Sequence, residues 1–234
     1  VKAGTGLINN KFSMNARLSK ITSEGYIDRA SSDLKSFYLD GTWQGKKSSL
    51  TANIFGGKER TYQAWYGTPQ SVIEGNEADI IAYADRNWIF GADRDNLLNS
   101  GRTYNHYTYE NEVDNYQQDH YQLHFTHRFN STLKLNLKGH YTRGRGYFEQ
   151  FRSDDDFSDY GLEPLIFTND TVTSGDFIRR RWLDNHFYGG IFSLNYERGN
   201  FDLVAGGGAN QYLGGHFGEL IWAEYASNGA LGHE

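Results

Sequence analysis

The sequence predicts an all-β fold that forms part of a transmembrane antiparallel up-and-down β-barrel with long extracellular loops. Three observations lead to this prediction. Seven segments alternate apolar and polar residues with a period of two, which is typical of half-buried strands. Short and long connections alternate strictly between these segments. The 27 Gly, 17 Tyr, 15 Phe and 5 Trp, beside only 2 Pro, favour strands and turns over a helical bundle.

The first three segments, residues 11–20, 36–44 and 48–56, each have one face of apolar residues and glycine. These faces are Phe12, Met14, Ala16 and Leu18; Phe37, Leu39, Gly41 and Trp43; and Leu50, Ala52 and Ile54. Phe55 is an exception on the polar side of the third segment. Because successive side chains of a strand point to opposite sides, each segment is expected to bury or to bring into lipid only one face.

The other four segments are residues 120–129, 133–142, 185–196 and 201–212. Their apolar faces are Tyr121, Leu123 and Phe125; Leu133, Leu135, Leu137, Gly139 and Tyr141; Tyr188, Gly190, Phe192, Leu194 and Tyr196; and Phe201, Leu203, Ala205, Gly207 and Ala209. Lengths of about nine to twelve residues match a tilted crossing of the hydrocarbon layer. The apolar faces are therefore expected to contact lipid, and the polar faces, with Lys134, Lys138 and Asp202, to line a lumen.

The connections distinguish a membrane barrel from a soluble sandwich. Short turns lie at residues 45–47, 130–131 and 197–200. The other connections, between the first and second, third and fourth, and fifth and sixth segments, have about 15, 60 and 40 residues. In an antiparallel sheet every short turn then falls at one end and every long loop at the other. Outer-membrane barrels have this arrangement as a rule, while nothing in the packing of a sandwich requires it.

The longest loop is predicted to contain two short helices. Thr68 is placed to cap the first, with Pro69 at the first helical position and Gly75 at the end. Asp93 is placed to cap the second, which Gly101 ends.

Composition excludes several classes of function. A formal net charge of -6 gives no electrostatic footprint for nucleic acid. The absence of cysteine from the sequence removes disulfides, thiolate zinc sites and cysteine nucleophiles. Apolar runs of only about five residues exclude a transmembrane helix, which needs roughly 20. The start at Val1 and the end at ALGHE indicate a piece of a longer chain.

Several stretches resemble the barrel domain of TonB-dependent outer-membrane receptors. They are NNKFSMNARLSKITSEGYIDRASSDLKSFYL from Asn9, KERTYQAWYGTP from Lys58, DNYQQDHYQL from Asp114, HYTRGRGYFEQF from His140 and RRRWLDNHFYGGIFSLNYE from Arg179. The resemblance spans nearly the whole chain. It implies that residues 1–234 are a partial barrel domain, about seven strands of a barrel of roughly 22 strands. The plug domain, the TonB box and the C-terminal strands of such receptors are absent from the sequence.

The resemblance also implies a function. Receptors of this family lie in the outer membrane of Gram-negative bacteria and import a nutrient ligand such as a siderophore, a vitamin or a glycan. Their partners are the TonB complex, which acts through the plug domain, and outer-membrane lipid. The alternative from another class is a soluble β-rich binding module or surface adhesin that binds carbohydrate. Glycosidase chemistry is a third hypothesis; we expect no enzyme activity and no cofactor.

Candidate ligand-binding residues fall into two groups. Aromatic rings crowd the longest loop, where they could stack on a ligand at a pocket mouth or form the core of the loop itself. The candidates among them are Tyr62, Trp65, Tyr66, Trp88 and Tyr107. Arg143 and Arg145 could hold an anionic ligand, as could Arg152 and the run Arg179, Arg180 and Arg181. Alternatively these arginines pair with loop acids or lipopolysaccharide phosphates.

Other constellations have simpler interpretations. Asp154, Asp155, Asp156 and Asp159 lack the spacing of a calcium loop and are interpreted as a solvated run. His120 and His124 lie too far apart along a strand to share a metal ion. The acidic pairs Asp79 with Asp85 and Asp114 with Asp119 have the residue types of a glycosidase, but nothing places either pair in one cleft. GRG at Gly144–Gly146 is interpreted as strand glycine that an adjacent tyrosine covers. We therefore predict no metal site and no catalytic residue.

Overall fold

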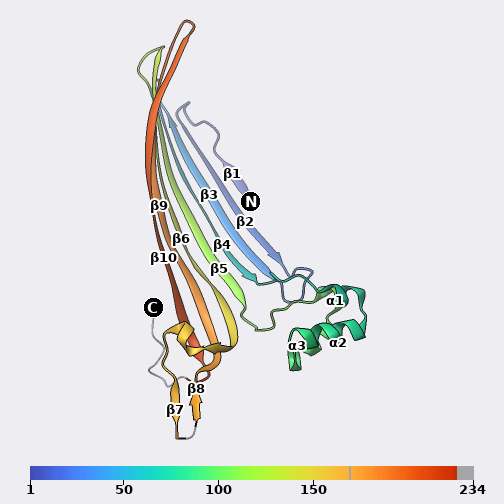
Figure 1. The fold of residues 1–234 in the computed structure, drawn as a ribbon. Helices are drawn as coiled ribbons and strands as arrows, with labels where there is room; N and C mark the ends of the chain where they lie inside the picture. Colours follow the sequence, from blue (N-terminus) through green and yellow to red (C-terminus); the bar gives the residue numbers. More distant parts are fainter. Residues whose placement is uncertain (169, 226–234) are drawn as a thin grey trace.

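The computed structural model describes residues 1–168 and 170–225, and in this part of the chain eight strands form one antiparallel sheet (Figure 1). The strands, in sheet order, are β1 (Lys2–Gly4), β2 (Phe12–Ser23), β3 (Ser32–Gln44), β4 (Ser48–Tyr62), β5 (Val113–Arg128), β6 (Leu133–Asp156), β9 (Ser174–Arg198) and β10 (Phe201–Ala223). Each strand pairs with its neighbour in the sequence, apart from the small hairpin between β6 and β9. The up-and-down order that the sequence predicts is confirmed.

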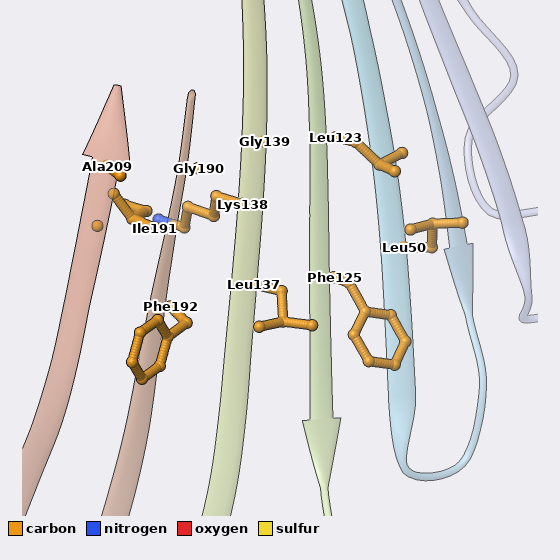
Figure 2. Close-up of a pocket in the computed structure, with 11 residues that line it drawn as sticks. Leu50, Leu123, Phe125, Leu137, Lys138, Gly139, Gly190, Ile191, Phe192 and Ala209 are labelled. Carbon is orange, nitrogen blue, oxygen red and sulfur yellow. The ribbon is translucent and has the colours of Figure 1, made fainter. Parts of the chain in front are cut away.

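The register places all seven predicted apolar faces on the same side of the sheet. One row of paired residues runs from Phe12 through Trp43, Leu50, Phe125 and Leu137 to Phe192. Figure 2 shows four of these side chains, Leu50, Phe125, Leu137 and Phe192, across neighbouring strands. We call this side of the sheet the apolar face and the opposite side, which includes Lys134, Lys138 and Asp202, the polar face.

The turns and loops separate by end, as predicted. In Figure 1 the turns that join β5 to β6 and β9 to β10 lie at one end of the sheet, and the helices and the β7–β8 hairpin lie at the other. We call these the turn end and the loop end. Strands β6, β9 and β10 are the longest, with 24, 25 and 23 residues.

The predicted lengths of the strands are wrong at the loop end. Strand β4 continues to Tyr62, β5 begins at Val113, and β6 continues to Asp156. The two longest loops therefore shrink to residues 63–112 and 157–173. The alternation fades in these extensions because both faces carry polar and charged side chains there, so the pattern gives no signal although the backbone pairing continues.

The loop at residues 63–112 contains three helices and a small core. The helices are α1 (Gln70–Glu74), α2 (Glu77–Arg86) and α3 (Gly91–Asn99), followed by the 3-10 turn η1 (Gly101–Thr103). Val72, Ile80, Ala84, Leu97 and Tyr104 form their common buried core. The polar β2–β3 connection is joined to this loop, because the backbone amide of Asp28 donates to the carbonyl of Thr103 at 2.7 Å.

The sequence predicts two of these helices and misses α2. Helix α1 ends at Gly75, which has a left-handed backbone with φ of 73°, as expected of a C-terminal glycine. Its N-cap is Pro69 rather than Thr68, and the N-cap of α3 is Phe90, with Asp93 in the first turn. The missed helix has a clear cap, since the Asn76 side chain accepts a hydrogen bond from the Ala78 amide at 3.1 Å.

The second loop contains the 3-10 turn η2 (Phe157–Tyr160) and the hairpin of β7 (Leu165–Phe167) and β8 (Asp170–Val172). The sequence predicts neither strand, because three-residue strands are too short to show a period. The C-terminal residues 226–234, where the sequence predicts no strand, lie outside the described residues.

The sheet does not close on itself within the described residues. Strand β1 and strand β10 are at opposite edges of the sheet order and do not pair with each other. The predicted open edge at β10 is confirmed. At the other edge β1, which the sequence does not predict, pairs with residues 15–17 of β2 and leaves the rest of that edge without a strand.

Candidate functional site

The apolar face is exposed over most of the sheet. Phe12, Leu123, Phe192 and Leu203 have exposed fractions of 50%, 51%, 52% and 52%. The buried hydrophobic cluster of the described residues lies in the helical loop and not on this face. A hollow of about 820 Å³ lies where Gly139 and Gly190 leave space between larger apolar side chains (Figure 2). A soluble sandwich would cover such a face with a second sheet, whereas lipid covers it in a membrane barrel.

The polar face has a network of hydrogen bonds between strands. The Asn136 amide donates to Ser193 Oγ and Asn195 Oδ1, both at 3.0 Å, and its own Oδ1 accepts from Thr126 Oγ1 at 3.0 Å. His120 Nδ1 lies 3.0 Å from Thr142 Oγ1. This face satisfies its polar groups across strands, as expected of a wall that faces a wet lumen.

Tyrosines mark the limit of the apolar face towards the loop end. Tyr121, Tyr141 and Tyr188 are directly opposite one another in the register of β5, β6 and β9. The Tyr121 and Tyr141 rings stack with centroids 5.9 Å apart, and the Tyr141 hydroxyl lies 2.8 Å from His186 Nδ1. A ring with one apolar and one wet end is typical of the membrane interface.

An aromatic cluster lies at the loop end of the sheet. Trp65 contacts Tyr107 and Phe148, with ring centroids 6.5 and 5.8 Å apart. Tyr66 contacts His106 and Tyr107, with centroids 4.5 and 5.6 Å apart. Trp65 and Tyr66 remain 63% and 60% exposed, so their rings are available to a ligand. We call Trp65, Tyr66, His106, Tyr107 and Phe148 the aromatic cluster.

The register places the aromatic cluster at the polar face. Phe148 pairs with Asp114 and Arg181 and lies on the polar face of β6. The guanidinium of Arg181 lies 5.7 Å from the centroid of the Phe148 ring and the side chain is exposed. A cation thus adjoins exposed rings where the polar face meets the long loop.

Buried polar residues hold this part of the loop in place. The fully buried Asn105 donates from its side chain to the carbonyls of Asp28 and Gln63 at 2.9 and 3.0 Å. Arg29 Nε donates to the Tyr107 carbonyl at 3.0 Å. Tyr107 is therefore fixed from the neighbouring β2–β3 connection as well as from its own loop.

The remaining predicted site residues lie elsewhere. Tyr62 is buried and donates its hydroxyl to the Tyr109 carbonyl at 2.6 Å, so it supports the loop. Trp88 is 82% exposed and contacts Phe90, not the aromatic cluster. Arg143 and Arg145 continue the apolar face of β6, so they lie on the opposite side of the sheet from the aromatic cluster. Both form ion pairs with Asp184.

His106 and Phe148 are members of the aromatic cluster that the sequence did not indicate, whereas Arg181 belongs to the arginine run considered for an anionic ligand. Phe148 and Arg181 come from strand extensions without alternation, so only the register brings them to Trp65. His106 adjoins Tyr107 in the sequence, and this adjacency was the one available signal.

A buried carboxylate joins the end of the loop to β6. Glu149 accepts hydrogen bonds from the Tyr109 hydroxyl at 2.9 Å, the Asn111 amide at 2.5 Å and Arg180 Nε at 2.8 Å. The adjacent Glu112 is also buried and accepts from the Phe151 amide at 3.2 Å. Burial raises the pKa of the Glu112 carboxyl to about 7, against weaker opposing effects of the Phe151 amide and Arg152.

The structure shows how two of the other constellations in the sequence, the acidic run and the GRG stretch, are arranged. Residues 1–168 and 170–225 contain no group of three or more histidine or acidic side chains placed to bind a metal ion. Asp155 is held by a bidentate pair with Arg152. A Cβ on Gly144 or Gly146 would collide with Tyr116, so a tyrosine does cover these glycines. None of the described helices is long and apolar enough to cross a membrane.

Comparison with known proteins identifies the fold. No family model and no curated protein matches the chain. Two solved structures of the ferric-catecholate import receptor Fiu from Escherichia coli K12 are similar. The closed form has 13% sequence identity and a TM-score of 0.60, over 94% of this chain and 29% of that chain. The open form has 12% identity and a TM-score of 0.57, over 94% and 34%.

This chain thus spans about a third of the length of these receptor chains. At such identities the similarity shows the fold alone. The chain has the fold of part of a TonB-dependent receptor barrel, which confirms the predicted fold class and, at the level of fold, the resemblance found in the sequence.

Proposed function

We propose that this chain is part of the barrel of an outer-membrane receptor, which binds a nutrient ligand at its outer mouth and takes it up through its lumen. The main support is the difference between the two faces of the sheet. One face exposes apolar residues such as Leu123 and Phe192, and the other has a continuous polar network around Asn136. The tyrosine row at Tyr121, Tyr141 and Tyr188 adds an interface marker at the loop end.

The proposal assigns ligand contact to the aromatic cluster. Exposed rings at a pocket mouth can stack on a ring of the ligand, and Arg181 offers a charge for an anionic group. The ligand classes that fit are a siderophore, a vitamin or a glycan. The similar receptor Fiu is described as an importer of ferric catecholate, which belongs to the first class.

The proposal also includes energy coupling. In a receptor of this fold, energy would come from the TonB complex through a plug domain of the complete protein. Uptake that continues in cells without TonB would exclude this part of the proposal. The plug would lie against the polar face, whose hydrogen-bonding side chains suit a hydrated interface.

Removal of the exposed rings tests the ligand site. In the receptor that contains this chain, W65A combined with Y66A is expected to reduce uptake of the ligand at least about tenfold, since stacking of one ring contributes on the order of 1 kcal/mol. W88A combined with F90A is the matched control, because these rings are also exposed but lie outside the aromatic cluster. Equal loss in both variants would contradict the site.

Extraction distinguishes the receptor from the soluble alternative. The receptor is expected in the outer-membrane fraction and to require detergent for release. A monodisperse protein in detergent-free buffer would instead support a soluble β-rich binding module or adhesin, and the apolar face would then have to be covered by protein.

A further inference from the structure

The apolar face has a row of positive charges at its loop end. Lys20, Lys35, Lys58 and Arg145 occupy β2, β3, β4 and β6, and the register aligns them with one another through Gln117 of β5. All four side chains are exposed. We call Lys20, Lys35, Lys58 and Arg145 the cationic row.

The arrangement is unfavourable without a counter-ion. Lys20 is directly opposite Lys35, and Lys35 is directly opposite Lys58, so like charges adjoin twice across neighbouring strands. Such pairs destabilise a sheet. Acidic side chains offset the charge only in part. Lys35 lies 3.1 Å from Asp33, and Arg145 lies 3.7 Å from Asp184, but Lys20 and Lys58 form no ion pair with any described residue.

The surroundings of the cationic row indicate what kind of molecule carries the counter-ion. Towards the turn end, the next pair on the apolar face of β2 and β3 is Leu18 with Phe37, followed by Ala16 with Leu39. Leu18 and Phe37 are 65% and 39% exposed. A molecule with an anionic head at the cationic row would therefore place its remaining part against exposed apolar side chains.

From this geometry we infer that the cationic row binds the phosphate groups of a phosphorylated lipid in the outer leaflet. This inference rests on the proposed function, because the apolar face must be turned to lipid. Lysine and arginine are common ligands of phosphate, and clusters of basic residues beside an apolar surface bind lipid headgroups. Neighbouring strands about 4.8 Å apart allow one headgroup to contact two or three of the side chains.

The test uses the detergent-solubilised receptor and lipid A, a glycolipid with two phosphate groups, as the probe. The variant K20Q/K35Q/K58Q removes three charges from the cationic row and leaves Arg145 and its contact with Trp182 intact. Affinity for lipid A is expected to fall roughly fivefold for each lysine, and on the order of 100-fold for the triple variant. Native mass spectrometry measures the bound lipid.

The control R17Q/K134Q/K138Q removes three charges from the polar face of the same sheet. Its lipid affinity is expected to remain within about twofold of the parent protein. An equal loss in the control would overturn the inference, since net charge would then explain the binding. Heat-modifiable migration on gels checks that both variants form the closed barrel.

Two further arms identify the source of the phosphate. Lipid A without its phosphates is expected to bind weakly to the parent protein, with about the affinity of intact lipid A for the triple variant. Inorganic phosphate at millimolar concentration is expected not to displace lipid A. Displacement by inorganic phosphate would overturn the inference in favour of a site for soluble phosphate. If the receptor is in the outer membrane and the triple variant binds lipid A as the parent protein does, this inference alone is overturned. If the receptor is absent from the outer membrane, the proposed function is overturned as well.

Discussion

Substitutions at Leu135 and Val204 compare the apolar face and the polar face at the same level of the sheet. Leu135 is in register with Leu194 and, through it, with Ala205, whereas Val204 adjoins Ala205 and points to the polar face. We expect L135R to lower the free energy of unfolding by about 2–4 kcal/mol, because arginine on a lipid-facing position near mid-membrane is destabilising.

The matched variant V204R is expected to have a much smaller effect, since its charge would enter a wet lumen. Urea unfolding of the receptor in vesicles measures both. Val204 is a better control than Asn136, whose side chain has hydrogen bonds that any substitution would break. Similar losses at Leu135 and Val204 would contradict the assignment of the faces.

At the residue scale, the sequence predicts part of the candidate site. Trp65, Tyr66 and Tyr107 belong to one loop, and their density in that loop was visible. Their contact with Phe148 depends on tertiary structure, because Phe148 lies in a strand after the loop. The side of Arg143 and Arg145 was predictable in principle, since both continue the odd-numbered face of Leu133 to Tyr141.

At the scale of elements, the attachment of the long loop to β6 is expected to depend on pH. The pKa of Glu112 in the folded protein is about 7, above the ordinary value of 4.5. Between these values the folded state holds a proton that the unfolded state has lost, so stability falls as pH rises from about 4.5 to 7.

The variant E112Q is expected to remove this part of the pH dependence, because glutamine resembles the protonated carboxyl and can still accept from the Phe151 amide. The matched control is E110Q, which changes an exposed carboxylate two residues away. The free energy of unfolding, measured between pH 5 and pH 8, should fall less with rising pH in E112Q than in the parent protein and in E110Q. An unchanged slope there would show that the burial of Glu112 has no energetic consequence.

The elements themselves were predictable wherever one face is apolar. Residues 133–142 show a full alternation, and β6 begins at Leu133 as the pattern predicts. Beyond Thr142 the strand continues to Asp156 through charged and aromatic residues on both faces, so periodicity cannot reveal it. Helix α2 was missed although Asn76 gives it a cap, because its apolar residues form a short continuous run at residues 80–84, from which periodicity alone does not distinguish a helix from a strand.

At the scale of the whole molecule, this chain alone is not expected to form a closed barrel. Within the described residues, β10 pairs with β9 on one side only. At the other edge, the segment that contains β1 forms backbone hydrogen bonds with β2 between Phe12 and Leu18, and residues 19–23 of β2 have no strand beside them. In lipid each unpaired backbone group costs several kcal/mol. Refolded in detergent, the 234-residue chain should form oligomers without heat-modifiable migration. A heat-modifiable monomer would contradict the open edges.

The central claim is that the apolar face contacts lipid and the polar face contacts water, and spin labelling along β6 tests it most directly. These 234 residues contain no cysteine, so single cysteines at residues 133 to 142 can be labelled in the complete receptor once any cysteine elsewhere in it has been replaced by serine. Accessibility to oxygen, which concentrates in lipid, and to a water-soluble nickel complex is then measured at each position. The odd positions, from Leu133 to Tyr141, should be accessible to oxygen, and the even positions, from Lys134 to Thr142, to the nickel complex. Odd positions shielded from both reagents would show that protein covers the apolar face, which would contradict a membrane barrel.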